Sequence, residues 1–213
     1  MTKSRPDTTT RRRLPPTPKP IYGSRSAGSW RAEGRGQRAE GRGQRVFDLG
    51  CGNGALARYL KGLGHEVTGV DPSESGIAIA RRADPELRLD VGNAYEDLAG
   101  RYGCFPFVVS LEVVEHVYHP RQYARCVRDL LESGGRAIIS TPYHGYLKNL
   151  ALALSGKMDA HFTALWDHGH IKFWSVKTLS ALFAEQGMVC EKVLRVGRIP
   201  ALGKSMILVF RKP

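Results

Sequence analysis

Apolar and polar residues alternate in blocks between residues 46 and 141. Five short apolar runs have the length of strands, and one of them, 105–111, is apolar almost throughout, which is typical of a strand buried on both faces. Three segments between the runs place apolar residues at helical spacing. The predicted strands are 46–49, 66–71, 87–91, 105–111 and 136–141, and the predicted helices are 54–63, 73–83 and 120–132. This alternation predicts an α/β fold with a doubly wound, mostly parallel sheet.

The alternation changes towards the C-terminus. Residues 143–172 are too many for a plain connection and predict a cap insertion with a short apolar helix at 146–154. A helix capped by Ser175 and two strands at 188–196 and 205–211 follow. Because no helix separates the last two strands, we expect a terminal antiparallel hairpin that completes a seven-stranded sheet.

Residues 1–45 differ from the rest of the chain. They are rich in Arg, Pro, Gly, Ser and Thr, and RAEGRGQ at 31–37 recurs unchanged at 38–44. We therefore predict a disordered, low-complexity basic arm at 1–45 and one folded domain at 46–213. The arm holds 12 Lys or Arg against 3 Asp or Glu, so that +9 of the formal net charge of +12 lies in it. Such an arm could bind nucleic acid or acidic lipid through phosphate groups, although a solvated tail without function is the simpler interpretation.

Cysteine spacing and hydropathy indicate the cellular setting. The four cysteines, Cys51, Cys104, Cys126 and Cys190, form no close CxxC pair, which argues against a zinc ribbon or a disulfide scaffold. No stretch approaches the roughly 18 consecutive apolar residues of a membrane span, and the N-terminus has no apolar signal core. We expect a soluble cytoplasmic protein without a membrane span, and the sequence leaves its oligomeric state open.

A glycine-rich segment, VFDLGCGNG, begins at Val46, where a strand must turn into a helix. Its glycines allow a tight turn and a close approach of a ligand to the backbone. These are Gly50, Gly52 and Gly54. Asp48 lies inside the strand, and Asp71 ends the second strand, where a carboxylate can accept hydrogen bonds from a ribose diol. Glycine turns also occur in nicotinamide-binding domains and in ordinary turns, so the two aspartates decide the interpretation.

With these residues the chain resembles the class I S-adenosylmethionine-dependent methyltransferases, in particular the small-molecule O-methyltransferases of the ubiquinone-biosynthesis type. The resemblance covers residues 46–141 and implies a Rossmann-like fold, a transferase and S-adenosylmethionine as cofactor. It implies that the glycine turn wraps the methionine part, that Asp71 binds the ribose, that Asp48 faces the ammonium group and that residues 93 and 94 meet the adenine. The implied cofactor-binding residues are Asp48, Gly50, Cys51, Gly52, Asn53, Gly54, Asp71, Pro72, Asn93, Ala94, Leu111 and Glu112.

A second motif, SLEVVEHVYHP, follows the fourth predicted strand at the edge where ligands of open α/β sheets bind. Glu112, Glu115 and His116 have i, i+3, i+4 spacing, so a single helical turn would place all three on one face. Two carboxylates and an imidazole suit a divalent cation. The pattern resembles the magnesium site of ubiquinone-type O-methyltransferases and of small-RNA 2'-O-methyltransferases, in which a later histidine completes the ligands. His170 or His168 is the candidate here.

Three roles stay open for this motif. A Mg²⁺ ion would lower the pKa of an acceptor oxygen, and its predicted ligands are Glu112, Glu115, His116 and His170. Alternatively, His116 acts as the catalytic base together with Glu115, or the motif only lines the pocket.

The cap insertion is rich in aromatic side chains. They would form a lid over an apolar or aromatic acceptor, or they simply pack the cap. These residues are Tyr143, His144, Phe162, Trp166, Phe173 and Trp174.

The sequence therefore predicts methyl transfer to a small-molecule acceptor, at an oxygen of a phenol, a quinol or another hydroxylated metabolite. An RNA 2'-O-methyltransferase is one alternative, although the folded domain is nearly balanced, with 20 basic and 17 acidic residues. A weakly active or inactive cofactor-binding domain is another, because the arginine and glycine tandem stands where relatives have an ordered helix that helps close the site. The identity of the acceptor and the methylated atom are left open.

Overall fold

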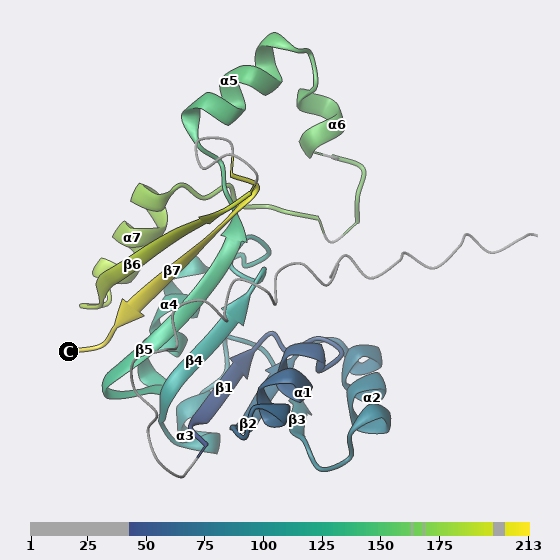
Figure 1. The fold of residues 1–213 in the computed structure, drawn as a ribbon, viewed down its shortest axis with the longest axis vertical. Helices are drawn as coiled ribbons and strands as arrows, with labels where there is room; N and C mark the ends of the chain where they lie inside the picture. Colours follow the sequence, from purple (N-terminus) through teal and green to yellow (C-terminus); the bar gives the residue numbers. More distant parts are fainter. Residues whose placement is uncertain (1–42, 163, 168, 198–202) are drawn as a thin grey trace, which may run out of the picture. The chain divides into compact units, whose positions relative to one another are not determined.

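A seven-stranded mixed sheet forms the centre of the described part of the chain (Figure 1). The computed structural model describes residues 43–162, 164–167, 169–197 and 203–213. The strands are β1 Arg45–Leu49, β2 Glu66–Asp71, β3 Arg88–Val91, β4 Phe105–Leu111, β5 Leu131–Pro142, β6 Val189–Val196 and β7 Ser205–Arg211. Their order is β3-β2-β1-β4-β5-β7-β6, parallel from β3 to β5 and antiparallel at β7 and β6. This confirms the predicted sheet and its terminal hairpin.

Helices cover both faces of the sheet. The helices are α1 Ala55–Gly62, α2 Glu74–Ala83, α3 Leu98–Tyr102, α4 Pro120–Asp129, α5 Tyr146–Leu154, α6 Met158–Phe162 and α7 Val176–Ala184. Ala57 and Ile77, from α1 and α2, share one buried cluster with Val67 of β2. Tyr123 and Leu179, from α4 and α7, share a larger cluster with Val70 on the other face of the same strand. The two clusters are those of a doubly wound fold.

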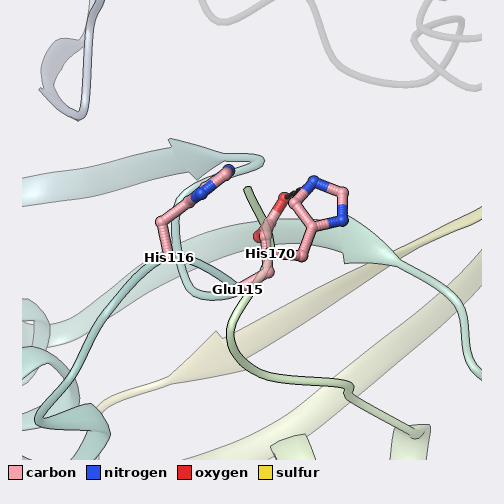
Figure 2. A group of neighbouring side chains, drawn as sticks. All are labelled: Glu115, His116 and His170. Atoms are coloured by element: carbon pink, nitrogen blue, oxygen red, sulfur yellow. Dashed lines mark ion pairs between the residues drawn. The ribbon is translucent and has the colours of Figure 1, made fainter. Parts of the chain in front are cut away.

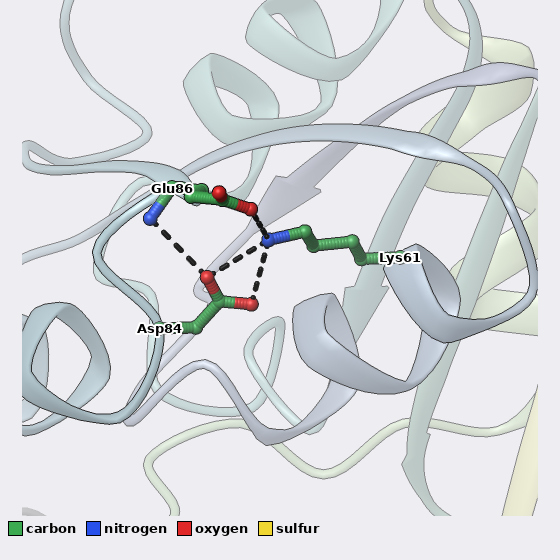
Figure 3. Close-up of polar contacts among 3 residues, drawn as sticks. All are labelled: Lys61, Asp84 and Glu86. Atoms are coloured by element: carbon green, nitrogen blue, oxygen red, sulfur yellow. Dashed lines mark hydrogen bonds and ion pairs between the residues drawn. The ribbon is translucent and has the colours of Figure 1, made fainter.

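Charged side chains join the C-terminal end of α1 to the loop before β3 (Figure 3). The Nζ atom of Lys61 lies 2.8 Å from both Asp84 Oδ1 and Glu86 Oε2. Hydrogen bonds, first of all the one to Asp84, raise the pKa of Lys61. Because solvent screens exposed pairs, this network fixes the position of the loop more than it stabilises the fold.

Several element boundaries differ from the sequence-based prediction, and two short helices are additional to it. The helix predicted at 120–132 ends at Asp129, because Leu131 already belongs to β5 and pairs with Phe105 of β4. Leu130 and Leu131 are both fully buried, so their hydrophobicity continues the helical pattern past the true end. The short helices α3 and α6 were not predicted, since five residues carry too little periodicity to detect.

The carboxyl ends of β1, β2, β4 and β5 meet at one edge of the sheet, and the strand order changes direction between β1 and β4 there. The cap with α5 and α6 rises from the same edge, directly after β5 (Figure 1). α5 buries none of its residues completely. Among the described helices, none combines the length and the hydropathy that crossing a membrane requires. The predicted arm at 1–45 lies almost wholly outside the described residues, and β1 begins at Arg45.

Candidate active site

The glycine turn has the backbone that its sequence predicts. Gly50, Gly52 and Gly54 have φ values of 87°, 52° and 73°, in the left-handed region that favours glycine. A Cβ on Gly50 would lie 2.3 Å from Val113 Cγ2, so this position has no room for a side chain. A Cβ on Gly52 would meet nothing within 4 Å. Gly52 therefore presents bare backbone to open space, as the approach of a ligand requires.

Asp71 is tied to this turn by both carboxylate oxygens. Oδ2 accepts a hydrogen bond from the amide of Gly52 at 2.8 Å, and Oδ1 accepts one from the amide of Ser73 at 2.8 Å. Each oxygen keeps a second lone pair. The carboxylate is thus oriented by the backbone and can still accept hydroxyl donors from a ligand.

Asp48 lies in the strand that precedes the turn, and its buried carboxyl group is not fully hydrogen-bonded. Its exposed fraction is 2%, and Oδ2 has no hydrogen-bond partner among the described residues. Burial, and then the negative charge of Asp71, raise the pKa of Asp48 to about 7. A cationic group bound above the turn would satisfy this oxygen and favour the charged carboxylate.

The other predicted cofactor residues have different surroundings. The Cys51 side chain is buried in the core with Ala57 and Ile77, so only its backbone could face a cofactor. Burial, and then Asp48, raise the pKa of its thiol. Asn93 Nδ2 donates a hydrogen bond to Glu96 Oε1 at 2.7 Å, and Asn93 Oδ1 accepts one from the amide of Tyr95. Asn53, Pro72, Ala94 and Leu111 also lie at the carboxyl ends of β1 to β4, as predicted.

The second motif is not the helical turn that its spacing suggested. Glu112 has a positive φ of 58°, the only such non-glycine residue among those described, and no helix lies between Glu112 and the start of α4 at Pro120. Its amide donates to the carbonyl of Ser140, and its Oε1 accepts from the Ser140 hydroxyl at 2.8 Å. Burial raises the pKa of Glu112, and this hydrogen bond opposes the rise. Glu112 therefore points to β5 and is separate from the other predicted ligands.

Glu115, His116 and His170 form one cluster (Figure 2). One potential ligand atom of each residue lies within 4.8 Å of those of the other two. His170 Nε2 is 4.0 Å from Glu115 Oε1, and the two imidazole rings meet edge to face at 4.9 Å between centroids. The second candidate histidine, His168, lies outside the described residues.

The charge state of this cluster is set by burial. Glu115 is 1% exposed, and neither of its carboxylate oxygens has a hydrogen bond of standard geometry among the described residues. Burial, and then Glu112, raise the pKa of Glu115 to about 8, although the Thr141 hydroxyl is near enough to lower it slightly. Burial, and then His116, lower the pKa of His170. The cluster thus holds a buried carboxyl group without a standard hydrogen bond among the described residues, beside an imidazole whose neutral form is favoured.

The cap backbone holds His116 in a defined tautomer. His116 Nδ1 lies 3.2 Å from the carbonyl oxygen of Gly169, which can only accept, so Nδ1 carries the proton. This leaves the lone pair of Nε2 free for a proton or a metal ion. The amides of Ile171 and Lys172 donate to the carbonyl of Glu115 at 2.9 and 3.0 Å. The backbone of the cap is therefore hydrogen-bonded to the motif both before and after His170.

The predicted aromatic lid is divided between two roles. Trp174 is 9% exposed, and its Nε1 donates to the carbonyl of Val114 at 3.0 Å, so it anchors the cap. His144, Phe162 and Phe173 contact one another through their rings. Trp166 is 52% exposed and packs against His170.

Sequence reasoning missed several residues that shape the site. Ser140 orients Glu112, and the Gly169 carbonyl orients His116, but neither residue type stands out in the sequence. The phenolic oxygen of Tyr95 accepts from the amide of Tyr118 at 2.8 Å and so fixes the end of the motif. Contacts between such distant residues carry no local sequence signal.

Comparison with known proteins places these features in context. The chain matches a family model described as a methyltransferase domain over residues 14–193. It is 33% identical over 167 residues to the ubiquinone biosynthesis O-methyltransferase of Caulobacter vibrioides, covering 75% of this chain and 65% of that protein. The mitochondrial ubiquinone biosynthesis O-methyltransferase of Mus musculus is 30% identical over 155 residues, covering 70% of this chain and 42% of that protein. The chain thus spans less than two thirds of the length of these relatives.

Solved structures agree in fold. An S-adenosylmethionine-dependent methyltransferase from Mesorhizobium loti is similar with a TM-score of 0.60 and 19% identity, covering 80% of this chain and 92% of that one. A second, from Methanosarcina mazei, has a TM-score of 0.62 and 18% identity, covering 81% and 93%. At these identities the similarity shows a shared fold.

Proposed function

The chain belongs to the methyltransferase domain family, and from this membership we propose that it transfers a methyl group from S-adenosylmethionine to an oxygen of a small hydroxylated acceptor, such as a phenol or a quinol. The observation that carries the proposal is the cluster of Glu115, His116 and His170 at the sheet edge that also holds the glycine turn. An imidazole with a free Nε2 beside a carboxyl group is suited to remove a hydroxyl proton. The names of the curated relatives also favour oxygen as the methylated atom.

The glycine turn and its two aspartates fit the cofactor. We assign the ribose hydroxyls to Asp71, whose carboxylate is already oriented by the amides of Gly52 and Ser73. We place the ammonium group beside Asp48, because Oδ2 of this buried carboxylate has no hydrogen-bond partner in the described part of the chain. The methionine part would lie along Gly52, where the backbone borders open space.

The cluster also fits a divalent cation, for which Mg²⁺ is our first choice. Its metal-binding atoms would be a Glu115 oxygen and the free nitrogens of His116 and His170. The three potential ligand atoms lie within 4.8 Å of one another, so the side chains would have to move closer together to hold one ion. Two imidazoles leave room for manganese or zinc. Glu112 would have to leave Ser140 to join as a fourth ligand.

A bound ion would act as a Lewis acid that lowers the pKa of an acceptor hydroxyl. Glu115, His116 and His170 would then hold the ion, and the proton of the acceptor would leave to solvent. Without an ion, His116 Nε2 takes the proton directly, since Nδ1 already donates to the Gly169 carbonyl. In both cases the oxygen is activated at the cluster, beside the methyl donor.

Mass spectrometry tests this function. The full chain is incubated with S-adenosylmethionine that carries a trideuterated methyl group, with Mg²⁺, and with a panel of phenols, catechols and quinols. We expect an O-linked CD₃ group on at least one acceptor and none after His116→Ala. Transfer to RNA riboses alone would favour the RNA methyltransferase instead, and cofactor binding without transfer to either class would favour an inactive domain.

A further inference from the structure

The cap contains a second group of polar side chains that the proposed reaction does not use. His144 precedes α5, Lys148 lies in its first turn and His161 lies in α6. The ring centroids of His144 and His161 are 5.7 Å apart. The ring of His144 stacks on that of Phe162, with 6.0 Å between centroids and an interplanar angle of 18°. We call His144, Lys148 and His161 the cap cluster.

Buried polar atoms in the cap cluster lack partners. His144 Nδ1 and His161 Nε2 are inaccessible to solvent and form no hydrogen bond among the described residues. A buried polar atom without a partner destabilises the fold, so these two imidazole nitrogens together indicate that a polar ligand belongs here.

Positive charge dominates the surroundings. Lys148 Nζ donates to the Tyr143 carbonyl at 3.0 Å, and no carboxylate pairs with it among the described residues. The acidic residues of the cap, Asp159 and Asp167, are exposed and form no ion pair with any described residue. Burial, and then Lys204, lower the pKa of Lys148. Burial, and then Lys148, His161 and His170, lower the pKa of His144 to about 4.

Two further features favour an anion. α5 begins at Tyr146 without a side-chain cap, so the partial positive charge of its N-terminus adds to that of Lys148. A metal cation would have to approach the Lys148 ammonium, which counts against the two histidines being a second metal site. An oxyanion would instead accept hydrogen bonds from Lys148 and from the imidazoles.

We propose that the cap cluster binds an oxyanion carried by the methyl acceptor, a carboxylate or a phosphate, with the acceptor ring against Phe162 and Phe173. The rings of Phe162 and Phe173 are 4.8 Å apart and both contact His144, so an aromatic ring and its anionic group would find their partners together. His170 is among the charges that lower the pKa of His144, and His161 is among those that lower the pKa of His170, so the cap cluster lies near the proposed methyl-transfer residues. This inference rests on the proposed function for the identity of the ligand, but not for the existence of the site.

Binding of simple probes tests the site without any methyl transfer. Benzoate, phenyl phosphate and the neutral benzamide are titrated into the full chain with S-adenosylhomocysteine at physiological ionic strength, and binding is followed by NMR of isotopically labelled histidine rings. We expect at least one anion to bind about tenfold more tightly than benzamide, as one charge-assisted hydrogen bond would give. The two anions distinguish a carboxylate acceptor from a phosphate acceptor. The ring signals of His144 and His161 should shift on binding.

Matched variants locate the effect. Lys148→Met should abolish the preference for the anion, whereas Lys157→Met, which removes an exposed lysine from the same cap, should leave it intact. Lys148→Arg keeps the charge and should retain the preference, so it serves if Lys148→Met does not fold. Equal affinity for benzamide and both anions, or an unchanged preference in Lys148→Met, would overturn the proposal. Because these measurements involve no turnover, the absence of anion binding can be distinguished from the absence of O-methylation.

Discussion

Single residues at the carboxyl edge of the sheet are held in states that a ligand would relieve. Among the described residues, Asp48 is buried with one oxygen unpartnered, and Glu115 has two buried oxygens without standard hydrogen bonds. Each of these buried carboxyl groups costs folding free energy in the free protein. Such local costs are expected where binding, not stability, determines the residue.

The ribose assignment predicts the effect of Asp71→Ala. Loss of the charged acceptor should weaken S-adenosylhomocysteine binding by about 1 to 3 kcal/mol, because hydrogen bonds from the ligand and from the Gly52 amide are lost together. Fluorescence titration of purified variants measures this. Asp84→Ala, which removes a carboxylate on the loop paired with Lys61, is the control and should bind normally. Normal binding by Asp71→Ala would refute the assignment.

The burial of Asp48 predicts a pH-dependent stability. Its pKa is about 7 in the folded protein and near 3.8 in the unfolded chain. The unfolded chain therefore loses its proton first, and Asp48 destabilises the fold progressively as the pH rises from about 4 to 7. Asp48→Asn should consequently unfold with a free energy roughly 2 to 4 kcal/mol higher than wild type at pH 8, with the gain vanishing near pH 4.

Denaturant unfolding at pH 4, 6 and 8 measures the gain. The same variant should bind S-adenosylhomocysteine more weakly, since an amide cannot compensate the ammonium group. Asp84→Asn serves as control and should show no gain, because Lys61 lowers the pKa of Asp84. If Asp48→Asn were no more stable than wild type at pH 8, Asp48 would be charged and compensated in the free protein.

At the scale of elements, the sequence predicts the strands and helices that local patterns determine. It does not predict the features that depend on contacts between residues far apart in the chain. The strands at 105–111 and 205–211 and the helix at 146–154 have the predicted bounds, because their apolar runs are continuous and end at turn residues. The spacing of Glu112, Glu115 and His116 suggested one helical face, but hydrogen bonds from Ser140 hold Glu112 apart in a left-handed conformation. The pairing of His116 with Gly169 joins residues 53 positions apart, and no local pattern predicts it.

The loop after β4 and the cap together supply the proposed metal ligands, so metal removal should affect methyl transfer. Excess EDTA should abolish methyl transfer and leave S-adenosylhomocysteine binding intact, because the proposed ion contacts the acceptor and not the cofactor. His116→Ala and His170→Ala should each reduce turnover by at least tenfold through loss of a ligand, as shown by initial rates at saturating cofactor. Unchanged activity in EDTA and in both variants would mean that the motif only lines the pocket.

At the scale of the whole molecule, charge is distributed unevenly: residues 46–213 are close to balanced, whereas residues 1–45 are strongly basic. The sequence predicts the fold class and most of the candidate site from the domain alone. The sequence assigns no role to residues 1–45, because a low-complexity segment lacks the regular spacing of apolar residues that indicates a fold.

Deletion of residues 1–42, which leaves β1 intact from Arg45, tests this division. We expect unchanged S-adenosylhomocysteine binding and unchanged turnover of a small acceptor, since neither depends on the arm. If the chain is instead an RNA methyltransferase, affinity for RNA should collapse with the arm, and its salt dependence should weaken as phosphate contacts are lost. Isothermal titration and filter binding supply the two readouts.

The central claim is that the glycine turn, Asp48 and Asp71 form an S-adenosylmethionine site. Isothermal titration of the full-length protein with S-adenosylhomocysteine, alongside NADH, tests it most directly, because both ligands offer a ribose but only one offers an ammonium group to Asp48. The account predicts one saturable site for S-adenosylhomocysteine and no measurable heat of binding with NADH. Binding of NADH without detectable affinity for S-adenosylhomocysteine would contradict it.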